Sequence, residues 1–168
     1  MDADFQLIQR MKHGDERAVE DFVRKYYPAI LRYCRLHIPQ YDLAEDVTQE
    51  TFEHFFRSFQ NYQHSGKALN YLYRIAANLC RDYFRQRIEP PEAMPERRGM
   101  EDVDGWLDVR RAVDALPAEL KEVAILFFFQ ELRQTEIAQV LNIGLPLVKY
   151  RIRKARELLT KNLKQEEF

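Results

Sequence analysis

The sequence predicts an all-α protein with two helical modules joined by an acidic, flexible linker. Apolar residues recur at steps of three and four along nearly the whole chain, and the alternating pattern of a half-buried strand is absent. Only 5 of the 168 residues are glycine while 46% are hydrophobic, a composition that favours packed helices over disorder. Seven acids, three prolines and two glycines gather at 89–109, where they prevent a core-facing helix and indicate the linker.

Residues 1–88 are expected to form the N-terminal module. Its first helix is indicated by apolar residues at steps of four, namely Ala18, Phe22, Tyr26 and Ile30. A second helix is expected at about 42–60 and, after a break at Gly66, a third at about 68–87. The start of the chain lacks the apolar core of a signal peptide, and no apolar run reaches the roughly 18 residues that cross a bilayer, so we expect a cytoplasmic protein.

Residues 110–168 are expected to form the C-terminal module, with the helical pattern resuming near Trp106. Pro117 fits the first position of a helix, so the preceding helix should end just before it. Three further helices are expected, at 117–130, 134–141 and 146–162. The last two have the layout of a helix-turn-helix, because residues 142–144 make a tight turn in which we expect Gly144 to take the unusual backbone angles.

The second helix of this motif has one apolar and one basic face. A helical wheel places four apolar residues together, namely Val148, Ile152, Ala155 and Leu159. Residues 149–164 hold seven basic side chains against one acid, Glu157. The basic face fits the DNA major groove, where outward side chains reach base edges and flanking cations meet phosphates; a merely solvated face is the alternative. The candidate DNA-binding residues are Leu147, Lys149, Tyr150, Arg151, Arg153, Lys154 and Arg156.

The helix at 42–60 combines an apolar stripe with an acidic one. The apolar stripe comprises Leu43, Val47, Phe52, Phe55, Phe56 and Phe59. The acidic stripe consists of four polar residues at steps of three and four, namely Asp46, Gln49, Glu50 and Glu53. Residues 42–53 hold five acids and no cation, a surface that repels DNA. It therefore indicates either a protein partner or a merely solvated face.

The helix at 68–87 and the loop before it have the opposite character. The helix interleaves Tyr71, Tyr73, Tyr83 and Phe84 with Arg74, Arg81, Arg85 and Arg87. Such a face suits single-stranded nucleic acid, because bases stack on rings and guanidinium groups hold phosphates; core packing is the alternative for most of the rings. The polar loop at 61–67 carries Tyr62 and suits an extruded base.

No pattern indicates catalysis, a metal or a cofactor. Cys34 and Cys80 lack a CxxC spacing and are expected as small, buried core residues. The four histidines stand alone, and the sequence has no Ser-His-Asp set, no phosphate-binding glycine loop and no HExxH motif. We therefore expect neither an enzyme nor a small-molecule substrate.

Four segments together resemble the extracytoplasmic-function (ECF) sigma factors of the sigma-70 family. They are AEDVTQETF (44–52), YLYRIAANLCRDYFRQR (71–87), ALPAELKEVAILFFF (115–129) and TEIAQVLNIG…VKYRIRKAREL (135–158). The resemblance covers both modules in the right order with the linker between them, and is more specific than a helix-turn-helix alone. It implies a sigma factor that binds core RNA polymerase and directs promoter-specific transcription initiation. Such proteins are usually held inactive by an anti-sigma factor, often membrane-bound.

The resemblance also implies roles for residues of the N-terminal module, which would be a sigma-2 domain. The acidic stripe would dock on the clamp helices of the polymerase β′ subunit. The loop at 61–67 and the helix from Asn70 would read the non-template strand of the −10 element, with Asn78 on the DNA-facing side. The residues concerned are Asn61, Tyr62, Lys67, Asn70, Tyr71, Arg74, Asn78, Arg81 and Arg85.

The C-terminal module would be a sigma-4 domain that reads the −35 element through Tyr150, Arg153 and Lys154 and packs on the β-flap. The acidic linker would thread the RNA exit path. The chain departs from the family pattern at several positions: the family usually has Trp where Tyr71 stands, Gly where Glu131 stands and a small residue where Tyr150 stands. The last departure affects which bases the helix prefers.

Two other classes of function fit parts of the sequence. An ordinary helix-turn-helix regulator, with an N-terminal sensing or dimerisation domain, would bind a palindromic duplex unaided as a dimer. A helical adaptor would bind protein alone and would show no salt-dependent DNA affinity. The acidic stripe and the aromatic-basic helix have no clear role in the first of these alternatives.

Overall fold

The computed structural model describes residues 3–86 and 106–166, and the regular elements in these two ranges are all helices. The N-terminal module contains α1 (Ala3–Lys12), α2 (Glu16–His37), α3 (Tyr41–Arg57), the short 3₁₀ helix η1 (Phe59–Asn61) and α4 (Ala68–Gln86). The C-terminal module contains α5 (Trp106–Asp114), α6 (Ala118–Ala124), the π-helical turn η2 (Ile125–Phe129), α7 (Gln134–Leu141) and α8 (Leu145–Glu166). The prediction of an all-α fold is confirmed. In the described ranges, no helix combines the length and the apolar character that crossing a membrane requires.

The first helix, α1, was not expected from periodicity. Gly14 turns the chain between α1 and α2 with a φ of +84°, and the Asp15 side chain then caps α2 by accepting hydrogen bonds from backbone N–H groups of its first turn. Lys25 and Tyr26 of α2 both donate to Asp4 of α1. These long-range polar contacts fix α1 against α2.

The core of the N-terminal module is largely aromatic. Phe22 of α2 stacks on Phe55 of α3 with ring centroids 4.9 Å apart. Tyr33 of α2 and Tyr73 of α4 are buried beside each other. Both cysteines are buried and free, as predicted. Helices α2, α3 and α4 thus enclose a core filled largely by aromatic side chains.

The C-terminal module contains the predicted helix-turn-helix, with α7 and α8 as its helices. The unusual backbone angles belong to Asn142, which has a φ of 54° and ends α7 in the left-handed conformation. The prediction for Gly144 was wrong, because its φ is not positive. Asn tolerates this conformation better than most residues with a Cβ, so it can end a helix as Gly often does.

Several helix boundaries differ from the prediction. Pro117 is the N-cap of α6 instead of its first helical residue, and α6 passes into η2 before residue 130. Helix α8 runs on to Glu166. Helix α5 begins at Trp106, where the helical pattern was expected to resume, so the last four residues of the linker predicted at 89–109 are helical. The rest of that linker lies outside the described residues.

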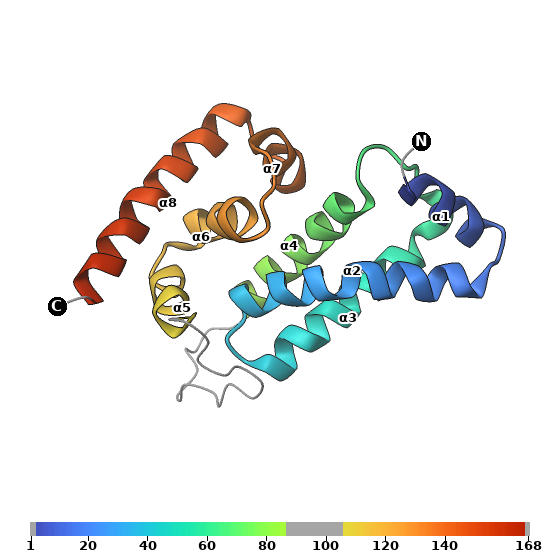
Figure 1. Cartoon of the computed structure of the whole chain (residues 1–168), viewed down its shortest axis with the longest axis horizontal. Coiled ribbons are helices and arrows are strands. Elements are labelled where there is room, and N and C mark those ends of the chain that lie inside the picture. The colour runs from blue at the N-terminus through green and yellow to red at the C-terminus, as the bar shows by residue number, and fades with distance from the viewer. Residues whose placement is uncertain (1–2, 87–105, 167–168) are drawn as a thin grey trace.

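The two modules pack against each other, with α4 beside α7 (Figure 1). Arg110 of α5 is only 2% exposed, and its guanidinium donates to the carbonyl of Arg35 in α2. The Gln130 side chain donates to the carbonyl of Ala29 at 2.9 Å. Apolar residues of both modules belong to one continuous core. The docked arrangement is therefore held by apolar burial and by hydrogen bonds to the backbone of α2.

Candidate nucleic-acid interface

The basic face of α8 is presented to solvent because the other side of the helix anchors it. Val148, Ile152 and Ala155 are at most 3% exposed, whereas Leu147 and Tyr150 are 39% and 48% exposed. Of the other candidate residues, Lys149, Arg153 and Arg156 are exposed and Arg151 and Lys154 are half-buried. The predicted orientation of the apolar and basic faces is confirmed.

Tyr150 lies at the centre of this outward face. The guanidinium carbon of Arg153 is 5.6 Å from the centre of the Tyr150 ring, and the Lys154 ammonium is 6.0 Å from it. Cation–π attraction orders these long side chains beside the ring. The face therefore offers hydrogen-bond donors that suit a guanine edge next to an apolar surface that suits a thymine methyl group.

Two flanking cations are held against the body of the C-terminal module. The Arg151 guanidinium lies 3.8 Å from the carboxylate of Glu119 in α6. The Arg156 guanidinium lies over the Phe128 ring at 5.5 Å from its centre. These contacts fix the two arginines at the sides of the helix, where a phosphate backbone would pass.

The acidic stripe occupies the outer side of α3. Its four residues, Asp46, Gln49, Glu50 and Glu53, are all exposed. Phe52 and Phe55 on the same helix are buried in the aromatic core, so the stripe cannot turn inward. The predicted orientation of this helix is confirmed, and its outer surface is suited to a cationic protein partner.

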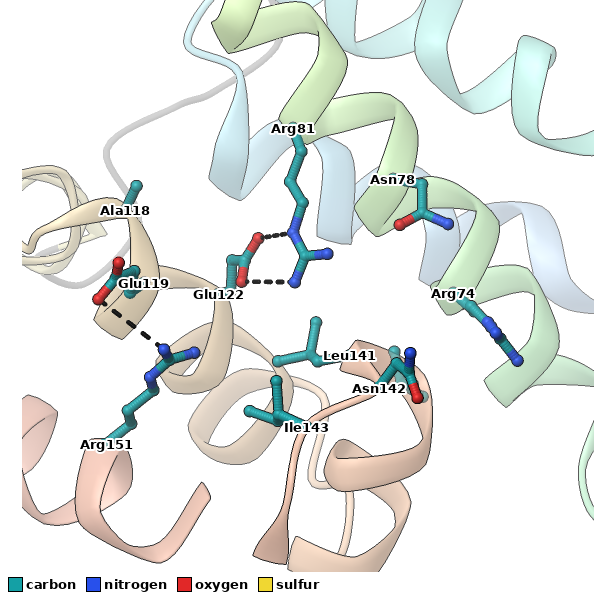
Figure 2. A pocket seen from close by; sticks show the side chains of 11 residues that line it. Arg74, Asn78, Arg81, Ala118, Glu119, Glu122, Leu141, Asn142, Ile143 and Arg151 are labelled. Carbon is teal, nitrogen blue, oxygen red and sulfur yellow. Dashed lines mark hydrogen bonds and ion pairs between the residues drawn. The ribbon is translucent and has the colours of Figure 1, made fainter. Parts of the chain in front are cut away.

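Helix α4 turns much of its polar side to the C-terminal module. Arg74, Asn78 and Arg81 line a cleft of about 640 Å³, whose opposite wall comes from α6, α7, the turn after α7 and α8 (Figure 2). Figure 2 shows Arg81 pointing across this cleft to Glu122. Arg85 is exposed near the end of the helix. The structure thus places several predicted −10-binding residues together, but at the contact between modules.

Two glutamates of the C-terminal module bind the polar side of α4 and the loop before it. Glu122 of α6 accepts hydrogen bonds from Nε and Nη2 of Arg81 at 2.5 and 3.0 Å. Glu136 of α7 accepts a hydrogen bond from Nδ2 of Asn70 at 2.6 Å and lies 3.3 Å from Nζ of Lys67. Sequence reasoning missed both glutamates, because their partners are 41 or more positions away along the chain. For Glu136, the sequence offered one local indication: it is the third residue of α7, a position where Glu often accepts a hydrogen bond from the N-cap backbone.

These contacts shift the pKa values of Arg81 and Glu136. The hydrogen bond to Glu122 raises the pKa of Arg81 above its already high usual value. Burial alone raises the pKa of Glu136, but hydrogen bonds from Asn70, from the Arg133 backbone N–H and from Lys67 outweigh it and lower the pKa below its usual range. Glu136 is therefore ionised at neutral pH and binds its donors as a carboxylate.

The loop after η1 is held in place by its neighbours. Tyr62, which was expected to be available to an extruded base, is only 7% exposed. Its ring centroid lies 5.0 Å from that of Tyr71, and its hydroxyl is 3.0 Å from Nδ1 of His64. Lys12 of α1 donates to the Tyr62 carbonyl at 2.7 Å. The expectation of an accessible Tyr62 ring is contradicted in this arrangement, because the ring fills space beside α3 and α4.

The cysteines contact each other in the core. The hydrogen bond between the Cys34 and Cys80 thiols lowers the pKa of Cys34 and raises that of Cys80. Within the part of the chain that the structure describes, no three His, Cys, Asp or Glu side chains are grouped to hold a metal ion.

Two family models match the chain, one in each module. The model for sigma-70 region 2 matches residues 22–88, and the model for sigma-70 region 4 matches residues 106–159. Together they cover most of the chain. The chain belongs to the sigma-70 family. Helix α1 lies outside both matched ranges of this sigma factor.

Relatives place this sigma factor among the ECF type. The ECF RNA polymerase sigma factor SigW of Bacillus subtilis is 29% identical over an alignment of 177 positions, which covers 94% of this chain and 95% of the relative. The ECF sigma factor SigE of Mycolicibacterium smegmatis is 37% identical over 87% of this chain and 63% of its own length. The structure is similar to that of CnrH in complex with the cytosolic domain of CnrY, with a TM-score of 0.79, 24% identity, and coverage of 98% of this chain and 99% of that one. An ECF sigma factor is a transcription initiation factor, and this one acts in promoter-directed transcription initiation.

Proposed function

We propose that this sigma factor binds core RNA polymerase and divides promoter recognition between its two modules. The outward face of α8 reads the −35 element as duplex DNA, and α4 with the preceding loop reads the −10 element as a single strand. The observation that carries the proposal is the ordered group of Tyr150, Arg153 and Lys154 on the solvent side of α8. Such a group can read base edges in the major groove.

The same proposal assigns the acidic stripe to the clamp helices of the polymerase β′ subunit. The four residues are exposed on one side of α3, and their negative charge suits a positive protein surface and opposes contact with DNA. The C-terminal module packs on the β-flap, and the linker threads the RNA exit path; most of that linker lies outside the described residues. The role is one of binding, without catalysis.

We further infer that an anti-sigma factor holds this protein inactive. Support comes from similar solved proteins, which are CnrH with the cytosolic domain of CnrY, and RpoE with the anti-sigma factor NepR from Bartonella quintana. The partner in the first pair is the cytosolic domain of CnrY, and we infer that the inhibitor of this chain likewise belongs to a membrane-anchored protein. The sigma factor itself works in the cytoplasm, where RNA polymerase is found.

The test is transcription with purified components. The protein is mixed with core polymerase, association is measured by size-exclusion chromatography, and run-off transcription is carried out on genomic DNA fragments. We expect a stable complex and transcripts that begin at a small set of promoters. Failure to associate with core polymerase, when no inhibitor is present, would overturn the proposal. Tight binding of a palindromic duplex by the protein alone would instead support an ordinary regulator.

A further inference from the structure

The carboxylates that face α4 have the chemistry of a nucleic-acid backbone. Glu122 accepts two parallel hydrogen bonds from Arg81, the geometry with which Arg also grips a phosphate. Glu136 accepts from Asn70 and pairs with Lys67, and both of these residues are expected to contact DNA. Each carboxylate is largely enclosed, with a side-chain exposure of 12% for Glu122 and 16% for Glu136. The two glutamates therefore occupy donors that a single strand would need.

The rest of the contact keeps the glutamates in position. Behind them, Arg110, Lys121 and Gln130 donate to backbone carbonyls along the second half of α2. These three residues lie on α5, on α6 and directly after η2. The C-terminal module is thus fixed to the side of α2 while α6 and α7 close over α4.

We propose that the C-terminal module is an intramolecular inhibitor of −10 binding, in which Glu122 and Glu136 take the places of DNA phosphates on α4. The inference rests on the proposed DNA role of α4. A donor engaged by a carboxylate is not available to a phosphate, so the closed arrangement and the DNA-bound arrangement exclude each other. The apparent affinity of the free protein for single-stranded DNA is then its intrinsic affinity reduced by the fraction of open molecules.

The test replaces both carboxylates by amides in the full chain, as Glu122→Gln with Glu136→Gln. Gln keeps the size of the side chain and can still serve the capping position at the start of α7, so the fold is retained. The matched control is Asp108→Asn with Glu131→Gln, which removes two charges from exposed positions of the same module. Control and test variants then have the same net charge. The comparison therefore separates the loss of the inter-module contacts of Glu122 and Glu136 from a general gain in attraction to DNA.

Two measurements are made on each protein. Energy transfer between dyes attached at Arg24 of α2 and Lys161 of α8, both exposed, reports the separation of the modules without DNA. Fluorescence anisotropy with a mixed-sequence single-stranded DNA of twelve nucleotides reports affinity. We expect the test variant to show a longer, broader distance distribution and about tenfold tighter DNA binding than the control, from two ion pairs that each change the equilibrium about threefold.

The two measurements separate the intramolecular inhibition from the proposed DNA role of α4. An unchanged inter-module distance in the test variant overturns the inhibition, whatever the DNA result. A protein that opens on substitution but binds the oligonucleotide no better than the control overturns the DNA role of α4, and the inhibition with it. A second variant combines Arg81→Glu with Glu122→Arg. Its inter-module distance should be as short as in the unsubstituted protein, because the ion pair is re-formed with its charges exchanged.

Discussion

The outward face of α8 separates side chains that can distinguish bases from one that can only meet phosphates. Arg153 and Lys154 flank the Tyr150 ring on this face, and Lys149 lies exposed at its side. Replacing Arg153 or Lys154 by Ala should therefore relax selectivity at particular −35 bases, by about 1–3 kcal/mol for an arginine that reads guanine.

Lys149→Ala should instead weaken binding to every sequence and reduce the salt dependence by about one counterion. Titration of a −35 duplex library at several salt concentrations measures both effects. Equal losses on all sequences in the three variants would contradict this division of roles.

A second residue-scale feature is Glu131, which has a φ of 58°. A side chain with a Cβ is strained in this conformation, and Gly is not. Glu131→Gly should stabilise the protein by up to about 1 kcal/mol, since the relief of strain exceeds the entropy that Gly loses on folding. Thermal unfolding measures the gain. Glu131→Ala is the control: it removes the carboxylate but keeps the Cβ, so it should give no comparable increase.

At the scale of elements, α3 separates polymerase binding from DNA binding. Charge reversal within the acidic stripe, as Glu50→Lys with Glu53→Lys, should weaken core polymerase binding by about tenfold or more, since like charges then face each other across the interface. Affinity of α8 for a −35 duplex should not fall. The control is Glu20→Lys with Asp21→Lys, an equal charge change on exposed positions of α2. If both pairs weaken polymerase binding equally, the stripe has no special role.

Helix α1 braces the loop that precedes α4. The Lys12 ammonium donates to the Tyr62 carbonyl at 2.7 Å and lies 5.5 Å from the centre of the Phe59 ring. Lys12→Met should speed amide hydrogen exchange in the loop several-fold, because a hydrogen bond worth about 1 kcal/mol is lost. Arg24→Met, which removes a cation from an exposed position of α2, should leave exchange in the loop unchanged.

At the scale of the whole molecule, docking of the modules should depend on pH through His37. This residue is buried, and its pKa is held well below the usual value by burial and by the cations of Lys121, Arg110 and Arg81. The closed form therefore keeps His37 neutral, whereas an undocked His37 would take up a proton below about pH 6.5. The contribution of His37 to the free energy of docking is fully present above that pH and decreases as the pH falls below it.

Small-angle scattering between pH 8 and pH 5 should show the radius of gyration increasing on acidification. Glu136 does not cause this effect, because its lowered pKa keeps it ionised in that range. His37→Gln has no titrating ring at this position, so its radius should change much less over the same range. An identical pH response in both proteins would rule out His37 as the cause.

Local patterns were sufficient to predict α3, α4, α7 and α8, and the side that α3 and α8 bury. Their apolar stripes repeat every three or four residues, and burial of such a stripe determines which face is exposed. The turn was misassigned because Asn142 and Gly144 can both adopt left-handed backbone angles, and the local sequence does not distinguish between them. The capping of α2 by Asp15 was readable in the same way, since it involves only its neighbours.

Most helices, the buried faces of α3 and α8 and the family of this sigma factor could be predicted from the sequence alone, because these features depend on residues close together in the chain. The three-dimensional packing was needed to show that Tyr62 is buried, that α1 braces the loop, and that Glu122 and Glu136 bind α4 and the loop before it. Each of those facts joins groups that the sequence separates by at least several residues and in most cases by dozens. Hydrophobic periodicity contains no information about which distant carboxylate meets which guanidinium; that is set by the three-dimensional docking of two finished modules.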